Sequence, residues 1–219
     1  MARKIAYNFA YHEGVDMPVI RAQGFTFDPS LMVRRVRDRY EATRNMRHKR
    51  MLGQVLEHLE GEVEFDLDQL MNAYPVPEPQ YRVWRDGVDV GPKGREAVRE
   101  WYAGHLRARG LVLQYDIETI VVDDRTIVTD GYMSAVLPGQ NVRDRGVPDA
   151  DPSKVYLKRY RNCILWPFNE AGELIGEEFH LSGNSGDSHL WILDDADVPQ
   201  EFHRLTKAAE SFEKGMSGT

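Results

Sequence analysis

Cysteine is almost absent from the sequence, because Cys163 is the only one among 219 residues. A single thiol cannot form an intrachain disulfide, and it excludes zinc and iron–sulfur sites that need several cysteines. Such a low cysteine content is typical of a reducing compartment. We therefore expect a cytoplasmic protein.

Long apolar runs and an excess of positive charge are also missing. No stretch approaches the roughly 18–20 apolar residues of a membrane span, and polar residues interrupt the N-terminal segment too early for a secretory signal. The formal net charge is −7 at pH 7, which argues against general nucleic-acid binding because phosphate contacts need a basic face. We expect neither a membrane nor a nucleic acid as a partner.

The signatures of metal, nucleophile and phosphate sites are absent as well. The seven histidines show neither HxH nor HExxH spacing. Residues 183–186 lack the full nucleophile-elbow pattern, and residues 87–94 lack the lysine and hydroxyl residues of a phosphate loop. The sequence therefore predicts no metal site.

The composition is that of a globular protein, with 42% hydrophobic and 29% charged residues. Glycine and proline interrupt residues 1–28, which we interpret as an N-terminal arm. We expect one domain at 29–182 and a C-terminal extension at 183–219 that contains a helix.

Helical periodicity dominates the first half of the chain. Residues 31–60 contain no proline and predict one bent helix or two consecutive helices, with Gly53 as the weak point. A short helix is expected at 65–74, after an aspartate cap, and another at 94–109.

After Gly110 the periodicity changes to two, which is typical of strands. Four strands are expected at 111–122, 126–137, 155–166 and 173–181, in addition to a strand at 81–85. Two of their connections are short turns, which favour antiparallel neighbours. The predicted fold class is α+β, with helices packed on an antiparallel sheet.

Three segments in this order resemble SnoaL-like and ketosteroid isomerase-like members of the nuclear transport factor two-like superfamily. They are DLDQLMNAY at 66–74, GREAVREWY at 94–102 and FNEAGELI at 168–175, and the resemblance spans roughly residues 50–182. It implies a cone-shaped barrel, in which helices lie across a curved sheet and enclose an apolar pocket.

The resemblance also implies roles for single residues. In ketosteroid isomerases, tyrosines at the positions of Tyr74 and Tyr102 support an oxyanion hole, and Trp101 matches an apolar wall of the pocket. The catalytic aspartate of those isomerases lies on the strand that matches 81–85, where this chain has no carboxylate before Asp86. This difference argues against steroid isomerisation by that residue.

The last predicted strand offers an acid–base pair. Glu178 and His180 are two residues apart and therefore share one face, whereas Glu177 and Phe179 share the other. The sequence does not fix which face meets the pocket. We select Glu178 and His180 as catalytic candidates, because His180 is the histidine on a predicted pocket strand and the helical His58 is expected in solvent.

Substrate contacts are expected from cationic, aromatic and amide side chains on the strands, together with Trp101. Arginine and tryptophan side chains can stack on an aromatic ring or hold a phenolate or carboxylate. The alternative for the first strand is an ordinary amphipathic edge. The candidates are Arg82, Trp84, Arg85, Met133, Tyr160 and Asn162.

These features lead to two functional hypotheses. The first is a cofactor-independent lyase, dehydratase or isomerase acting on a hydroxylated aromatic or polycyclic molecule; one branch of the superfamily removes formaldehyde from lignin-derived diarylpropane diols. The second is a non-catalytic ligand-binding or dimerisation module. A carboxylate or histidine within hydrogen-bond reach of a tyrosine hydroxyl in a closed pocket would favour the enzyme. We expect a homodimer or higher homo-oligomer.

Overall fold

The computed structural model describes residues 27–85, 87–182 and 190–217. The predicted N-terminal arm at 1–28 falls outside the described residues except for Phe27 and Asp28, and so does the segment 183–189. None of the helices within the described ranges has both the length and the apolar character needed to cross a lipid bilayer.

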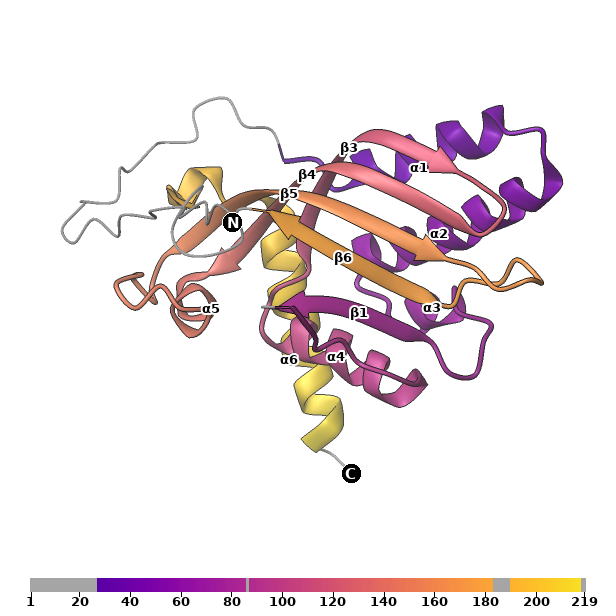
Figure 1. The fold of residues 1–219 in the computed structure, drawn as a ribbon. Helices are drawn as coiled ribbons and strands as arrows, with labels where there is room; N and C mark the ends of the chain where they lie inside the picture. The colour runs from indigo at the N-terminus through magenta and orange to yellow at the C-terminus, as the bar shows by residue number, and fades with distance from the viewer. Residues whose placement is uncertain (1–26, 86, 183–189, 218–219) are drawn as a thin grey trace, which may run out of the picture.

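A curved, unclosed sheet forms the frame of the molecule (Figure 1). Its strand order is β2-β1-β6-β5-β4-β3, and β7 pairs with β5. Strands β1 and β6 are parallel, and the other pairs are antiparallel. The strands are β1 (Gln80–Arg85), β2 (Val88–Asp89), β3 (Val112–Val122), β4 (Thr126–Pro138), β5 (Val155–Pro167), β6 (Gly176–Ser182) and β7 (Leu190–Leu193).

The helices pack on this sheet, which confirms the predicted α+β class; in Figure 1, α1 to α3 lie behind the strands. The short helix α5 lies in the connection between β4 and β5, where no helix is predicted above. The helices are α1 (Ser30–Ala42), α2 (Met46–Glu64), α3 (Leu67–Asn72), α4 (Arg95–Arg107), α5 (Gly139–Asp144), the 3-10 turn η1 (Asp195–Asp197) and α6 (Gln200–Ser217).

The first helical stretch forms two helices, and the break lies at Thr43–Asn45 instead of at Gly53. The side chain of Asn45 accepts hydrogen bonds from the backbone N–H groups of Arg47 and His48, which caps the start of α2. Gly53 lies inside α2, where its neighbours continue the helix.

Curvature of the sheet has a local cause in the β3–β4 pair. The register shifts between Ile117 and Thr119, as in a β-bulge, and a bulge bends a strand and increases its twist. Opposite the shift, a Cβ atom on Gly131 would lie 2.0 Å from the carbonyl oxygen of Asp116, so only glycine fits there. The bend gives the sheet a concave face toward α2 and α4.

Candidate active site

A cavity of about 170 Å³ lies between the concave face of the sheet and the helices. The strands contribute alternate residues to its wall, as expected for side chains that point to one face. From β5 these are Lys158, Tyr160, Asn162, Ile164 and Trp166, and from β6 they are Glu177, Phe179 and Leu181.

A buried carboxylate, Glu177, ends the cavity on one side. Its Oε1 atom accepts hydrogen bonds from the hydroxyls of Tyr74 at 2.5 Å, Tyr81 at 2.6 Å and Tyr102 at 3.3 Å. Nε2 of His58 lies 3.0 Å from the same oxygen. All five side chains are at most 2% exposed, so this network is shielded from bulk water.

Five separate elements bring this acid–base cluster together. His58 extends the buried stripe of α2 that contains Val55 and Leu59, and its Nδ1 atom lies 3.0 Å from the Tyr74 hydroxyl, just beyond α3. Tyr81 is the second residue of β1 and Tyr102 lies on α4, with their hydroxyl oxygens 3.0 Å apart. Parallel pairing of β1 with β6 sets Tyr81 directly beside Glu177.

Burial and charge shift the pKa values of the cluster. Burial raises the pKa of Glu177, although the nearby His58 acts in the opposite direction. Burial would lower the pKa of His58, but the charges of Glu177 and Glu62 outweigh it and raise the pKa. Burial, reinforced by the Glu177 charge, holds the pKa of each of the three tyrosines well above 10, so their hydroxyls stay protonated as donors.

Only part of this cluster faces the cavity. Glu177 and Tyr102 line it, together with Glu62, while His58, Tyr74 and Tyr81 stand behind them. Among the described residues, every hydrogen bond to the Glu177 carboxylate ends on Oε1. The Oε2 atom takes part in none of these hydrogen bonds, so its acceptor positions are not used by them.

The other end of the cavity is cationic. Arg145, just after α5, and Lys158 line this end with His105 and Tyr160. Burial lowers the pKa of His105 to about 4, with help from the Arg145 charge, so its imidazole is neutral at pH 7. Burial also raises the pKa of Tyr160 to about 12, although Arg145 acts in the opposite direction.

Five residues chosen from the sequence line the cavity. Trp101 and Tyr102 come from α4, Met133 from β4, and Tyr160 and Asn162 from β5. Tyr74 lies one layer behind the wall, where it binds Glu177 and His58. The structure thus brings both proposed oxyanion tyrosines to one carboxylate.

Glu178 and His180 lie elsewhere, which corrects their expected place in the pocket. They are on the outer face of the sheet, where Nε2 of His180 is 3.0 Å from Oε1 of Glu178 and the His180 side chain is 48% exposed. Burial would raise the pKa of Glu178, but hydrogen bonds from Trp84, His180 and Arg82 outweigh it and lower the pKa. Strand parity explains the correction, since Glu177 and Phe179 take the inner face.

The cationic and aromatic residues of β1 are also outside the cavity. The Arg82 guanidinium binds Glu178 at 3.3 Å and the Trp84 indole donates to Glu178 at 2.9 Å, both on the outer face. Arg85 ends β1, and its side chain is outside the described residues. The wall expected from Arg82, Trp84 and Arg85 is formed instead by Val83 and Phe179.

Sequence reasoning missed Glu177, Tyr81 and His58. His58 is fully buried, so its assignment to solvent is wrong. The sequence contained a signal for Glu177. Ile175, Phe179 and Leu181 are apolar and lie at the alternate positions that share a strand face with Glu177, and an apolar face is typically the inner one. His58 follows Val55 by three residues on the buried face of α2, which is a helical-periodicity signal of the same kind.

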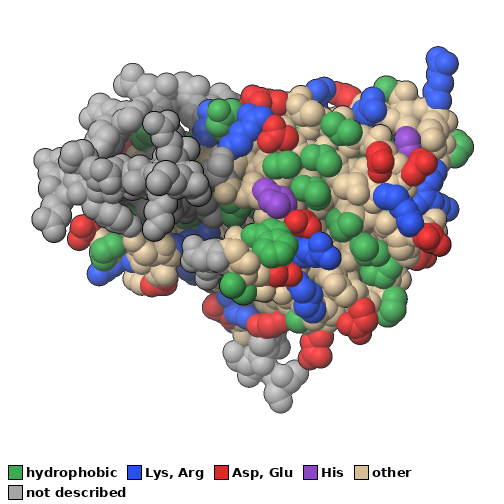
Figure 2. All heavy atoms as spheres, viewed as in Figure 1, with side chains coloured by type: hydrophobic (Ala, Val, Ile, Leu, Met, Phe, Trp, Pro, Cys, Tyr) green, Lys and Arg blue, Asp and Glu red, His purple; other side chains and the backbone are tan. Residues whose placement is uncertain are grey.

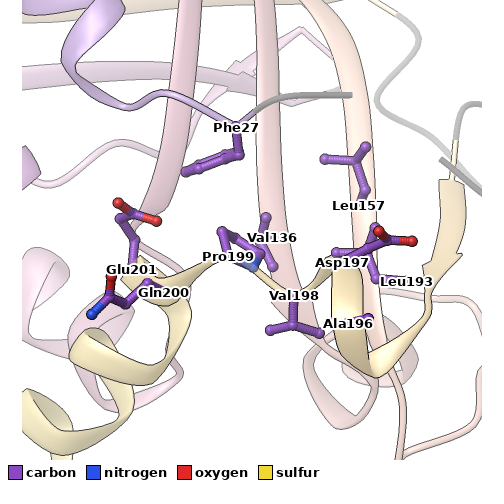
Figure 3. A pocket seen from close by; sticks show the side chains of 10 residues that line it. All are labelled: Phe27, Val136, Leu157, Leu193, Ala196, Asp197, Val198, Pro199, Gln200 and Glu201. Carbon is purple, nitrogen blue, oxygen red and sulfur yellow. The ribbon is translucent and has the colours of Figure 1, made fainter. Parts of the chain in front are cut away.

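A larger hollow of about 330 Å³ lies near the start of α6 (Figure 3). Its wall combines Phe27, Val136 and Leu157 with the segment 196–201. Among the described residues that line it, the ionisable ones are the carboxylates Asp197 and Glu201, and none is a histidine or tyrosine. The smaller cavity is the candidate active site, because it holds the hydrogen-bonded acid–base cluster. No group of three or more His, Cys, Asp or Glu side chains in the described ranges is arranged to hold a metal ion.

Solved structures of two proteins described as SnoaL-like polyketide cyclases share this fold. The protein from Shewanella denitrificans matches with a TM-score of 0.51 and 13% identity, over 64% of this chain and 95% of that one. The protein from Shewanella putrefaciens matches with a TM-score of 0.51 and 10% identity, over 64% of this chain and 95% of that one. The sequence matches no family model and no curated protein. The chain therefore has the fold of these SnoaL-like proteins.

Proposed function

We propose that this chain is an enzyme that catalyses proton transfer in the cavity without a cofactor, on a hydroxylated aromatic or polycyclic molecule. The observation that carries the proposal is the placement of Glu177 in the cavity wall, with Oε1 held by tyrosine hydroxyls and His58 and with Oε2 available. A fixed carboxyl group in an apolar, water-poor site suits general acid–base catalysis.

In this mechanism Glu177 exchanges a proton with the substrate through Oε2. His58 and the tyrosines behind it stabilise the carboxylate form, and burial favours the neutral form, so both protonation states are accessible. The hydroxyl of Tyr102, which lines the cavity, donates a hydrogen bond to a substrate oxygen that gains negative charge.

The lining supports an aromatic substrate. Trp101, Tyr160, Phe179 and Trp166 contribute rings to the wall, and offset or edge-on ring contacts hold aromatic ligands in a defined orientation. The two Shewanella proteins with this fold are described as polyketide cyclases, so a polyketide belongs in the panel of candidate substrates.

The narrowest form of the proposal is deformylation of a diarylpropane diol to a stilbene. The substrate reacts as its phenolate: an acid protonates the benzylic hydroxyl, which leaves as water, and the electrons of the phenolate form a quinone methide. A base then takes the proton of the terminal hydroxyl, the carbon–carbon bond breaks to release formaldehyde, and the electron pair restores the aromatic ring. Water, formaldehyde and the stilbene balance the diol, with no external oxidant or reductant, and Glu177 serves as acid and then as base.

The experiment is a turnover screen with diarylpropane diols, hydroxynaphthalenes, steroids and polyketides. Glu177→Gln keeps the shape of the side chain but cannot exchange the proton, and we expect its kcat to fall by about 10²–10⁴-fold. The matched control is Glu178→Gln on the outer face, which should keep wild-type kcat. Equal turnover by the two variants contradicts the proposal, and tight ligand binding without turnover by wild-type protein favours a binding module.

We further propose that the protein is cytoplasmic and forms a homodimer through the outer face of the sheet. Hydrophobic side chains lie among charges of both signs on the face in Figure 2. On the outer face of the sheet Trp84 is 45% exposed and Tyr132 is 38% exposed, and such aromatic side chains are enriched in protein interfaces. Light scattering with Trp84→Ser should show a shift from dimer to monomer, and a wild-type monomer contradicts the proposal.

A further inference from the structure

Side-chain nitrogen atoms of three residues lie close to Gly110 in the cavity wall. A Cβ atom at this position would lie 3.4 Å from Nη2 of Arg145, 3.4 Å from Nδ1 of His105 and 3.5 Å from Nδ2 of Asn141. The Arg145 guanidinium therefore lies in contact range of Gly110, beside His105 and Asn141, at the edge of the cavity. Asn141 is fixed there, because its Nδ2 donates to the carbonyl oxygen of Ala108 at 3.0 Å.

Arg145 has no ion-pair partner among the described residues, and its charge interacts with Tyr160 and His105 instead of with a carboxylate. The two carboxylates of the cavity, Glu62 and Glu177, are at the other end beside His58. Guanidinium groups present planar N–H donors that match an anionic oxygen. The cavity thus has a cationic end and an acid–base end.

A second observation indicates that a polar molecule belongs in the cavity. Asn162 is 1% exposed and lines the wall, and its Oδ1 atom has no hydrogen-bond partner among the described residues. A buried acceptor without a donor is destabilising, so such atoms in folded proteins are commonly satisfied by a ligand or a water molecule. On β5, Asn162 is four residues from Lys158 and four from Trp166, about 13 Å along the strand in each direction.

We infer that the cavity binds an aromatic compound through an anionic oxygen, a phenolate or a carboxylate, which the Arg145 guanidinium holds at the cationic end. The remainder of the compound extends past Asn162 toward Glu177. This inference deepens the proposed function and rests on it for the identity of the reacting end. In the narrow form of that function, the phenolate oxygen lies at Arg145 and the benzylic carbon lies nearer Glu177.

The test is a binding comparison with three probes: 4-nitrophenol, 4-nitrobenzoate and the uncharged 4-nitroanisole. Their dissociation constants are measured by calorimetry or by quenching of the cavity tryptophans Trp101 and Trp166. We expect wild-type protein to bind at least one acidic probe about tenfold or more tightly than 4-nitroanisole, as for a charge-assisted hydrogen bond. A preference for 4-nitrophenol identifies a phenolate site, and one for 4-nitrobenzoate identifies a carboxylate site.

Arg145→Met should remove this preference. Arg143→Met should keep it, because both arginines are exposed but only Arg145 of the two lines the cavity. The inference is overturned if wild-type protein binds neither acidic probe, if all three probes bind equally, or if Arg145→Met keeps the preference. Glu177→Gln separates the two proposals. If wild-type protein turns over no substrate but its preference for an anion depends on Arg145, the proposed function fails and the binding inference stands. If Glu177→Gln loses turnover but Arg145→Met keeps the preference for an anion, the proposed function stands and the binding inference fails.

Discussion

Nε2 of His58 lies 3.0 Å from Oε1 of Glu177, and both side chains are buried. With both imidazole nitrogens protonated, Nε2–H donates to Glu177 and Nδ1–H donates to the hydroxyl oxygen of Tyr74. The hydroxyls of Tyr74 and Tyr81 then donate to Glu177. This arrangement gives both imidazole nitrogens of His58 and the Oε1 atom of Glu177 hydrogen-bond partners, and such partners are what make a buried charge pair tolerable.

Tyr102→Phe should impair catalysis more than stability. Tyr102 is the tyrosine of the acid–base cluster that lines the cavity, so its hydroxyl is the one available to a substrate oxygen. Removal of one such donor costs about 10²–10³-fold in kcat. Steady-state kinetics on the substrate found by the screen provide the measurement, with the exposed Tyr132→Phe as the control. An unchanged kcat in Tyr102→Phe removes Tyr102 from the mechanism and leaves Glu177 to be judged separately.

Tyr74→Phe should instead reduce the free energy of unfolding. The Tyr74 hydroxyl contacts Nδ1 of His58 and donates to Oε1 of Glu177 behind the cavity wall, and its loss leaves buried partners unsatisfied. The expected cost is about 1–3 kcal/mol. Urea unfolding measures it, and Tyr132→Phe on the outer face should change stability by less than about 0.5 kcal/mol. Equal stability of the two variants would mean that the cluster contributes little to folding.

The order of the elements could be predicted because each has a local signal. The expected strand at 126–137 is observed as Thr126–Pro138, and the expected helix at 94–109 as Arg95–Arg107. Alternation and helical periodicity depend only on neighbouring residues, so one sequence is enough to detect them. The break between α1 and α2 was misplaced because a polar cap at Asn45 outweighs a mid-helix glycine.

The candidate site was harder to predict because contacts between distant segments create it. Tyr81 meets Glu177 only because β1 pairs in parallel with β6, and no local pattern reports this pairing. The face of β6 that turns inward decides between Glu177 and Glu178, and a shift of one residue exchanges the two faces. The apolar residues Ile175, Phe179 and Leu181 indicate that the face with Glu177 turns inward. The prediction chose the face with Glu178 instead, because a histidine on that face is a good acid–base group.

His58 should make stability depend on pH. Its folded-state pKa is raised above 6.5, because Glu177 and Glu62 outweigh the effect of burial. The folded state therefore holds the proton more tightly, and this contribution is complete below pH 6.5 and is lost as the pH rises through the folded pKa. Urea unfolding from about pH 6 to about pH 9 should show stability falling with pH, with a slope of at most about 1.4 kcal/mol per pH unit from this group.

His58→Gln isolates this effect, since it removes the titrating group from the buried pair. The slope above pH 6.5 should become shallower in His58→Gln, while His180→Gln on the outer face should keep the wild-type slope. The groups that face His58 are Glu177, Glu62, Tyr74 and Tyr102. The pKa of Glu177 is also raised in the folded state, so its titration likewise makes stability fall as the pH rises above 4.5. If His58→Gln and wild type show identical slopes, the pH dependence of stability comes from groups other than His58.

Two glycines of α2 should respond to alanine in opposite ways. At Gly53 the nearest atom to a new Cβ is Cε2 of Tyr40 at 3.6 Å, which is an ordinary contact, so the higher helix propensity of alanine should stabilise the protein by about 0.5–1 kcal/mol. At Gly61 a Cβ would lie 2.6 Å from the backbone nitrogen of Leu70 in α3, and α2 and α3 would have to separate. We expect Gly61→Ala to lower the free energy of unfolding by about 1–3 kcal/mol, despite the higher helix propensity of alanine.

Urea unfolding of the Gly53→Ala and Gly61→Ala variants measures the difference. A stabilised Gly61→Ala would contradict the close approach of α3 to α2, which places Tyr74 beside His58.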